Sequence, residues 1–189
     1  ARAYYVLHSW DYYSSHLNEL FSIWKGGLAI YGGVIAGILV VLFFGRRNRS
    51  RFNILSFLDL GSLGLLLGQA IGRWGNFVNG EAFCGPTSLP WGMSISQSVQ
   101  PVSILVHPAF LYESLWNLTG FVLLHFYSRH RKFRGELFAW YCVWYGLGRG
   151  VIEGLRTDSL YIVGTNIRVS QVVAFAGFAV GALFLAYLY

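Results

Sequence analysis

ILSFLDLGSLGLLLGQAIGRWGNFVNGE, residues 54–81, is the stretch that decides the fold, because a mostly apolar run ends abruptly in a polar, glycine-rich segment. Residues 54–72 are about long enough to cross the hydrocarbon core of a bilayer as one helix. Residues 72–81 then place an arginine, two asparagines and a glutamate among glycines. A charged side chain at the bilayer centre costs about 2.5–3.5 kcal/mol. An arginine at the end of an apolar span therefore needs a physical reason.

A binding site for a phospholipid headgroup would supply that reason. Anionic headgroups lie at the depth where the span ends, and the planar fork of arginine matches the oxygens of a phosphate. The glycines would let backbone N–H groups approach the anion. The residues predicted to bind the headgroup are Arg73, Asn76, Asn79, Gly80 and Glu81. The alternative is an arginine that extends to the membrane interface, with asparagine forming a turn.

The composition predicts an all-α, polytopic membrane protein. The chain has 189 residues, of which 55% are hydrophobic and only 12% are charged, whereas soluble domains carry about 25% charged residues. Further apolar spans are expected at 27–44, about 107–127, about 136–152 and 169–189. Residues 1–8 resemble the tail of an earlier span. We therefore expect one integral membrane domain over residues 1–189, with five full transmembrane helices and part of a sixth.

Charge distribution gives the expected topology. The net charge is +6, and the basic residues form two short clusters at 46–51 and 129–134. The positive-inside rule places the loops at about 45–53 and 128–135 in the cytoplasm, together with the C-terminus. The loops at about 9–26, 73–106 and 153–168 then face outward. Clusters of this kind encode topology, so no nucleic-acid partner is expected. Cys84 and Cys142 have no ligand-like spacing, so no metal site is expected.

A second polar constellation lies in residues 145–156. On a helix, Tyr145, Arg149 and Glu153 recur every four residues on one face, and Arg156 follows three residues later. A glutamate between two arginines would fix their rotamers and leave an excess of positive charge. The alternative is a structural ion-pair cluster at the end of a helix.

Five other polar residues require an interpretation. Glu113 and Asp59 lie inside predicted spans, and we interpret both as buried structural partners of an arginine. Tyr31 precedes two glycines that would open space beside its phenol, although plain packing explains them equally well. Asn48 and Asn117 begin glycosylation sequons, but one is predicted to be cytoplasmic and the other to lie in the membrane, so neither is expected to be modified.

Four segments together resemble the bacterial prolipoprotein diacylglyceryl transferase family. They are WKGGLAIYGG (24–33), GRWGNFVNGEAF (72–83), HPAFLYES (107–114) and YGLGRGVIEGLRTD (145–158). The second segment resembles the family signature. The family has seven membrane helices, with the C-terminus inside. The resemblance implies that this chain corresponds to the part from the end of the second helix onward, without the first helix and most of the second.

The resemblance also implies a function. The family transfers the diacylglyceryl group of phosphatidylglycerol to the lipobox cysteine thiol of a preprolipoprotein signal peptide. This reaction is the first step of lipoprotein maturation, and it occurs at the outer face of the bacterial inner membrane without a cofactor. By position, Arg73 resembles the arginine that binds phosphatidylglycerol, and Arg149 resembles a second essential arginine paired with Glu153. Tyr31 and Tyr145 occupy positions that assist the thiol. The family residues important for activity also include those matching Asn76 and Glu81.

Three departures keep rival functions open. Some family members have histidine where this chain has Tyr31, and the signature usually has glycine at the position of Cys84. The first helix of the family carries a functionally important tyrosine. A non-catalytic lipid-binding or scaffold protein is therefore one alternative. A transporter or channel is another, but its polar residues would tend to lie at the membrane midplane in repeated halves. Here they gather toward one face.

Overall fold

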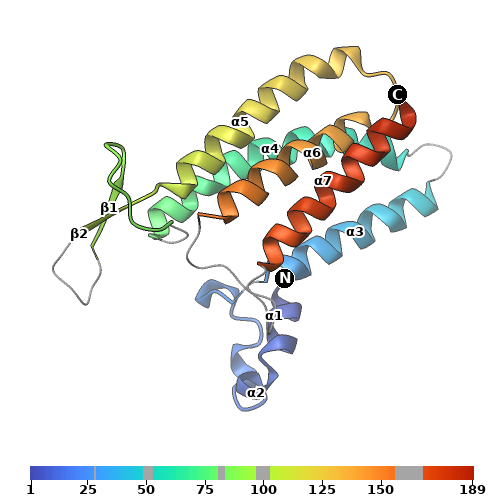
Figure 1. Cartoon of the computed structure of the whole chain (residues 1–189). Helices are drawn as coiled ribbons and strands as arrows, with labels where there is room; N and C mark the ends of the chain where they lie inside the picture. The colour runs from blue at the N-terminus through green and yellow to red at the C-terminus, as the bar shows by residue number, and fades with distance from the viewer. Residues whose placement is uncertain (28, 49–52, 81–83, 97–102, 156–167) are drawn as a thin grey trace. The chain divides into compact units, whose positions relative to one another are not determined.

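The computed structural model describes residues 1–27, 29–48, 53–80, 84–96, 103–155 and 168–189. The chain divides into two compact units, Ala1–Ile54 and Leu55–Tyr189. Within the described ranges, long helices form at each of the five predicted spans, so the all-α expectation is confirmed (Figure 1). The predicted loops 9–26, 45–53 and 73–106 are partly helical or strand-like.

The first unit contains α1 (Arg2–His8), α2 (Trp10–Tyr13), two short 3-10 helices, η1 (Leu17–Glu19) and η2 (Ile23–Lys25), and the long helix α3 (Ile30–Arg47). The Arg2 guanidinium organises the segment before α3. It donates hydrogen bonds to the backbone carbonyls of Glu19, Leu20, Gly26 and Gly27 at 2.6–3.1 Å. It also lies 5.1 Å from the centre of the Tyr13 ring. One half-buried cation thus binds four backbone carbonyl groups of the segment that precedes α3.

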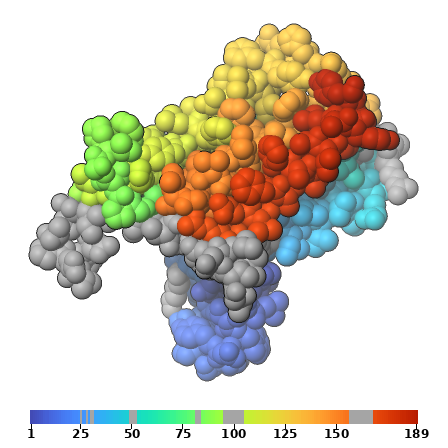
Figure 2. All heavy atoms as spheres, viewed as in Figure 1, coloured from blue at the N-terminus to red at the C-terminus, as the bar shows by residue number. Residues whose placement is uncertain are grey.

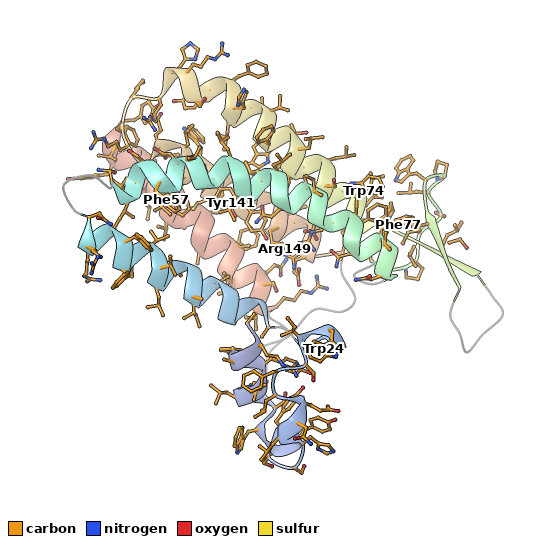
Figure 3. The ribbon with its side chains drawn as sticks, turned by 180° about the vertical axis from the view of Figure 1, so that it is seen from behind. Trp24, Phe57, Trp74, Phe77, Tyr141 and Arg149 are labelled. Carbon is orange, nitrogen blue, oxygen red and sulfur yellow. The ribbon has the colours of Figure 1, made fainter. Side chains whose placement is uncertain are left out.

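The second unit begins with α4 (Ile54–Asn79), which corrects the predicted end of its span. The helix continues past residue 72, because Trp74, Phe77 and Val78 extend its apolar spacing beyond the glycines. It ends at Gly80, whose φ of 65° is the left-handed conformation typical of a helix C-terminus. Trp74 and Phe77 lie near this end of α4 and Phe57 lies near its start (Figure 3). Arg73 and Asn76 are therefore helical residues, with side chains at fixed angles around one axis.

The other long helices are α5 (Ala109–Tyr127), α6 (Glu136–Glu153) and α7 (Val169–Leu188). By length and composition, α4 and α7 are apolar enough to cross a membrane, among the residues described. A short antiparallel hairpin, β1 (Met93–Ser96) and β2 (Ser103–Val106), lies where the sequence predicted a loop or re-entrant elements. MSIS alternates apolar residues with serine, and SILV is a short apolar run with two β-branched residues; both patterns are typical of strands. Figure 2 shows the hairpin in green, projecting beyond the helices of its unit.

The core of the second unit lies between α4, α5 and α6. Its buried residues are Leu66, Leu124 and Tyr141, one from each helix. The Gln69 side chain of α4 donates a hydrogen bond to the Tyr141 hydroxyl at 3.0 Å. Helix α7 packs along α6, as the orange and red helices of Figure 2 show. Apolar contacts and one hydrogen bond between side chains thus fix the position of α4 against α6.

Buried carboxylates anchor the turn between α5 and α6. Asp59 accepts hydrogen bonds from the backbone N–H groups of Gly135 (2.8 Å) and Phe138 (3.1 Å), and pairs with Arg131 at 3.2 Å. The expectation that Asp59 is a structural partner of an arginine is confirmed. Glu136, fully buried, accepts the hydroxyl hydrogen bond of Tyr127 at 2.5 Å. The antiparallel α5–α6 pair is therefore fixed at the end where the basic cluster lies.

Candidate active site

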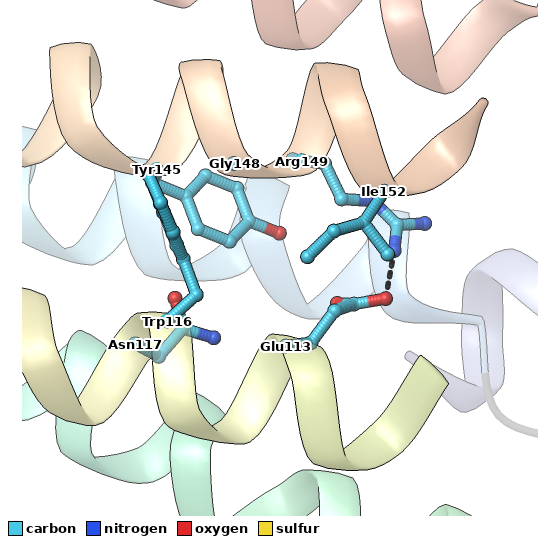
Figure 4. Close-up of a pocket in the computed structure, with 7 residues that line it drawn as sticks. All are labelled: Glu113, Trp116, Asn117, Tyr145, Gly148, Arg149 and Ile152. Carbon is cyan, nitrogen blue, oxygen red and sulfur yellow. Dashed lines mark hydrogen bonds and ion pairs between the residues drawn. The ribbon is translucent and has the colours of Figure 1, made fainter. Parts of the chain in front are cut away.

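One carboxylate joins the two arginines that the sequence singled out. Arg73 on α4 places Nη2 at 2.6 Å from Oε2 of Glu113 on α5. Arg149 on α6 places Nη1 at 2.7 Å from Oε1 of the same carboxylate. Glu113 is buried, with 4% of its side chain exposed, and the two guanidiniums are largely shielded. Three helices thus meet at a single buried ion-pair cluster, which Figure 4 shows in part.

A second carboxylate extends the cluster along α6. Glu153 lies one turn after Arg149, with Oε2 at 2.7 Å from Nη2, and only 2% of its side chain is exposed. Arg168 at the start of α7 donates a hydrogen bond to the backbone carbonyl of Glu153. The pairing of Arg149 with Glu153 is confirmed. The four charges of Arg73, Glu113, Arg149 and Glu153 cancel. The expected excess of positive charge depended on Arg156, which lies outside the described residues.

Neighbouring polar contacts fix the helix that carries Glu113. The Trp74 indole N–H donates a hydrogen bond to the Ser114 hydroxyl at 3.2 Å. That hydroxyl donates to the Ala70 carbonyl at 2.9 Å. Ser114 directly follows Glu113, and Trp74 directly follows Arg73, so these bonds tie α4 to α5 beside the ion pair. Asn76, one turn after Arg73, accepts a hydrogen bond from Arg73 Nη1 at 3.3 Å.

A narrow, half-open pocket lies beside the ion pair, between α5 and α6 (Figure 4); its empty space of about 170 Å³ includes open solvent. Tyr145 and Arg149 contribute to its wall from α6, one turn apart, and Glu113 contributes from α5. The remaining lining residues are Trp116, Asn117, Gly148 and Ile152. The Tyr145 ring stacks on Tyr141 at 5.6 Å between ring centres, which holds the phenol toward the pocket. A phenol, a guanidinium and a carboxylate therefore converge on one space.

The predicted site residues divide into three groups. Arg73, Asn76, Arg149 and Glu153 belong to the ion-pair cluster, and Tyr145 lies in the adjoining pocket. Asn79 and Gly80 lie at the exposed C-terminal end of α4. The remaining three cannot be placed: Glu81 and Arg156 fall outside the described residues, and so does the Tyr31 side chain, although its backbone belongs to α3.

Sequence reasoning missed two features of the site. Glu113 was correctly expected to pair with an arginine, but not to join both predicted arginines. Asn117 was considered only as a glycosylation sequon, yet it is 98% buried, and its Oδ1 has no hydrogen-bond partner among the described residues. Its position four residues after Glu113 was the available signal, because such residues share one face of a helix.

Comparisons with known proteins identify the chain. In the part of the chain that the structure describes, two helices are long and apolar enough to cross a membrane, and a buried arginine–glutamate cluster joins three helices. The family model described as prolipoprotein diacylglyceryl transferase matches residues 1–187. The chain belongs to this family and is a transferase.

Three relatives support this assignment, and each is named phosphatidylglycerol–prolipoprotein diacylglyceryl transferase. The protein of Acaryochloris marina is 47% identical over 195 residues, which cover 100% of this chain and 70% of the relative. That of Streptococcus uberis is 45% identical over 188 residues, with coverage of 97% and 71%. That of Finegoldia magna is 46% identical over 184 residues, with coverage of 97% and 70%.

Proposed function

We propose that this chain transfers the diacylglyceryl group of phosphatidylglycerol to the lipobox cysteine thiol of preprolipoprotein signal peptides. The observation that carries the proposal is the convergence of Arg73 and Arg149 on one buried carboxylate. Family membership and the names of the relatives support the same reaction. A non-catalytic lipid-binding protein or a transporter has no comparable support.

The proposed setting is the bacterial inner membrane, crossed by all five long helices. Only 22% of the apolar window of α4 and 17% of that of α7 are buried within the protein. A core helix of a soluble protein would be mostly buried, so these apolar surfaces suit contact with lipid. The basic clusters at 46–51 and 129–134 favour a cytoplasmic C-terminus. The ion-pair cluster then lies toward the outer face.

The proposed role of the arginines is to bind the lipid phosphate and to neutralise the leaving group. Each guanidinium carries five N–H donors, and the glutamates occupy only some of them. The Nε of Arg73 is buried and has no hydrogen-bond partner among the described residues. It is a donor that the glutamates leave unused. Glu113 and Glu153 hold the guanidiniums in place, so little reorganisation is needed when charge develops.

The proposed reaction is a displacement at carbon. The lipobox thiol loses its proton, and its sulfur forms a bond to the glyceryl carbon that carries the phosphate ester. The bond between this carbon and the ester oxygen breaks, and glycerol phosphate leaves with the electron pair. A free thiol has a pKa near 8.5, so removal of its proton assists the attack. Tyr145, one turn from Arg149 on the pocket wall, is the proposed proton acceptor.

Other predicted residues keep proposed roles. Tyr31 is proposed to assist the thiol. Asn76, Asn79 and Gly80 are proposed to bind the headgroup from the end of α4, with Glu81 beyond it. Arg156 is proposed to add a positive charge after Glu153. The reaction as written needs no cofactor or metal ion.

The test is a reconstituted transfer assay. The chain is placed in vesicles that contain phosphatidylglycerol labelled in its acyl chains, and a lipobox peptide is added. The expected result is a peptide with the added mass of diacylglycerol, joined by a thioether, together with released glycerol phosphate. A peptide with serine in place of the lipobox cysteine is the matched control and should remain unmodified. Lipid binding without thioether formation would instead support the non-catalytic alternative, and ion flux across the vesicles would support the transporter.

A further inference from the structure

Two tryptophans on neighbouring helices bind each other reciprocally. The rings of Trp116 on α5 and Trp144 on α6 stack, with 4.4 Å between ring centres and an interplanar angle of 18°. The Trp116 indole N–H donates a hydrogen bond to the Trp144 carbonyl at 3.0 Å. The Trp144 indole N–H donates to the Trp116 carbonyl, also at 3.0 Å. Each residue is thus both donor and acceptor in the same contact.

A glycine follows each tryptophan by four residues and makes this contact possible. A Cβ atom added to Gly148 would lie 2.0 Å from Nε1 of Trp116, and one added to Gly120 would lie 2.4 Å from Nε1 of Trp144. In a helix, the N–H of residue i bonds to the carbonyl of residue i−4. The indole must therefore reach a carbonyl directly beside the residue four positions on, and only glycine leaves that space open.

These four residues lie beside the groups proposed to react. Trp144 directly precedes Tyr145, and Gly148 directly precedes Arg149. Trp116 and Gly148 line the pocket, whereas Trp144 and Gly120 do not (Figure 4). A slip of one residue between two helices moves side chains by about 1.5 Å along the axis and by about 100° around it. Such a slip would break the 2.7 Å contact between Glu113 and Arg149.

We propose that Trp116, Gly120, Trp144 and Gly148 form a register lock that positions Arg149 and Tyr145 opposite Glu113. This inference rests on the proposed transfer reaction, and it assigns the lock a positioning role in that reaction. The two reciprocal hydrogen bonds can form in only one register of α5 against α6. Both indoles must reach a carbonyl beside a glycine at the same time. Apolar packing alone is less specific, since a slipped pair of lipid-facing helices still buries similar surface.

The test uses two variants at residues outside the pocket, Gly120→Ala and Trp144→Phe, in the full chain. Gly120→Ala pushes the Trp144 indole away, and Trp144→Phe keeps an aromatic ring but removes the N–H donor. Gly177→Ala on α7 is the matched control, because nothing lies within 4 Å of its added Cβ. Circular dichroism reports the stacked indole pair as an exciton couplet, and the transfer assay gives kcat and KM for folded protein.

We expect the couplet to disappear in both variants and to persist in the control. Misplacement by about 1 Å can cost about 10²-fold in rate, so kcat of Gly120→Ala should fall on that order while KM changes less. The kcat of Trp144→Phe should fall by a smaller factor. Adding Gly120→Ala to Trp144→Phe should lower kcat by a smaller factor than the same substitution does in the parent chain. Parent-level kcat in folded Trp144→Phe would overturn the proposal, even if Gly120→Ala did not fold. A parent chain without transfer activity would instead refute the proposed function, while the couplet would still report the lock.

Discussion

Glu113 and Arg149 lie on different helices, yet Oε1 of Glu113 is 2.7 Å from Nη1 of Arg149. The other oxygen of the same carboxylate binds Arg73. The Glu113 carboxylate therefore sets the distance between the two guanidinium groups. Breaking one partner out of a buried pair leaves an uncompensated charge, which costs about 3–5 kcal/mol.

Glu113→Gln should reduce both stability and transfer. The amide keeps the shape of the side chain but carries no negative charge, so the two guanidiniums lose their shared countercharge and repel each other. We expect a lower unfolding temperature in detergent and a loss of transfer by folded protein. Asp11→Asn, at an exposed position in α2, is the control and should match the parent in both measurements. Parent-level transfer by folded Glu113→Gln would show that the carboxylate does not organise the site.

Arg73→Ala should abolish transfer while the protein still inserts into the membrane. Loss of one donor to a developing anion typically costs about 10²–10³-fold in kcat. Arg73→Lys should restore only part of the activity, because an ammonium group keeps the charge but cannot bind Glu113, Asn76 and a phosphate with one planar fork. Membrane fractionation and the labelled-lipid assay measure the two effects separately. Near-normal transfer by the alanine variant would exclude the proposed role.

Asn117→Leu should separate stability from activity. The Oδ1 of Asn117 is buried without a partner among the described residues, and replacing an unsatisfied polar group by an apolar one of similar size is neutral or stabilising. We therefore expect an unchanged or higher unfolding temperature and slower transfer, because the wall of the pocket in which Tyr145 is proposed to act loses a polar acceptor. A variant with parent-level transfer would limit Asn117 to a packing role.

Asp59→Asn should destabilise the protein without changing the chemistry. Asp59 accepts two backbone N–H groups at the start of α6 and pairs with Arg131, and none of these residues lines the pocket. The expected result is a lower unfolding temperature with parent-level transfer per folded molecule. A specific loss of kcat in the folded variant would contradict this separation.

Cys84→Gly should keep transfer at the parent level or improve it. Cys84 is almost fully buried, and its backbone N–H donates a hydrogen bond to the His107 carbonyl at 3.3 Å. We therefore interpret Cys84 as a structural residue that holds the backbone next to the hairpin. Glycine is also the usual residue of the family signature there. The labelled-lipid assay measures the effect. An inactive but folded variant would mean that the thiol takes part in the reaction.

The sequence alone determined the positions of the long helices and the residues that bear charge among them. Span length and apolar content are local properties, so the helices at 54–79 and 169–188 could be predicted. The end of α4 could not, because the glycines after residue 71 suggested that the helix stopped there. The spacing of Arg149 and Glu153 likewise predicted their pairing. The two arginines were recognised because charged residues in apolar surroundings are costly.

Only the tertiary structure decided which groups meet. That Glu113 joins Arg73 to Arg149, that Asn117 faces the pocket and that two tryptophans lock α5 to α6 all depend on the rotation and register of separate helices. Hydrophobic periodicity states which face of a helix is apolar, but it does not state which turn of one helix lies opposite which turn of another. That choice is made by contacts far apart in the chain, and so it is settled only when the helices pack.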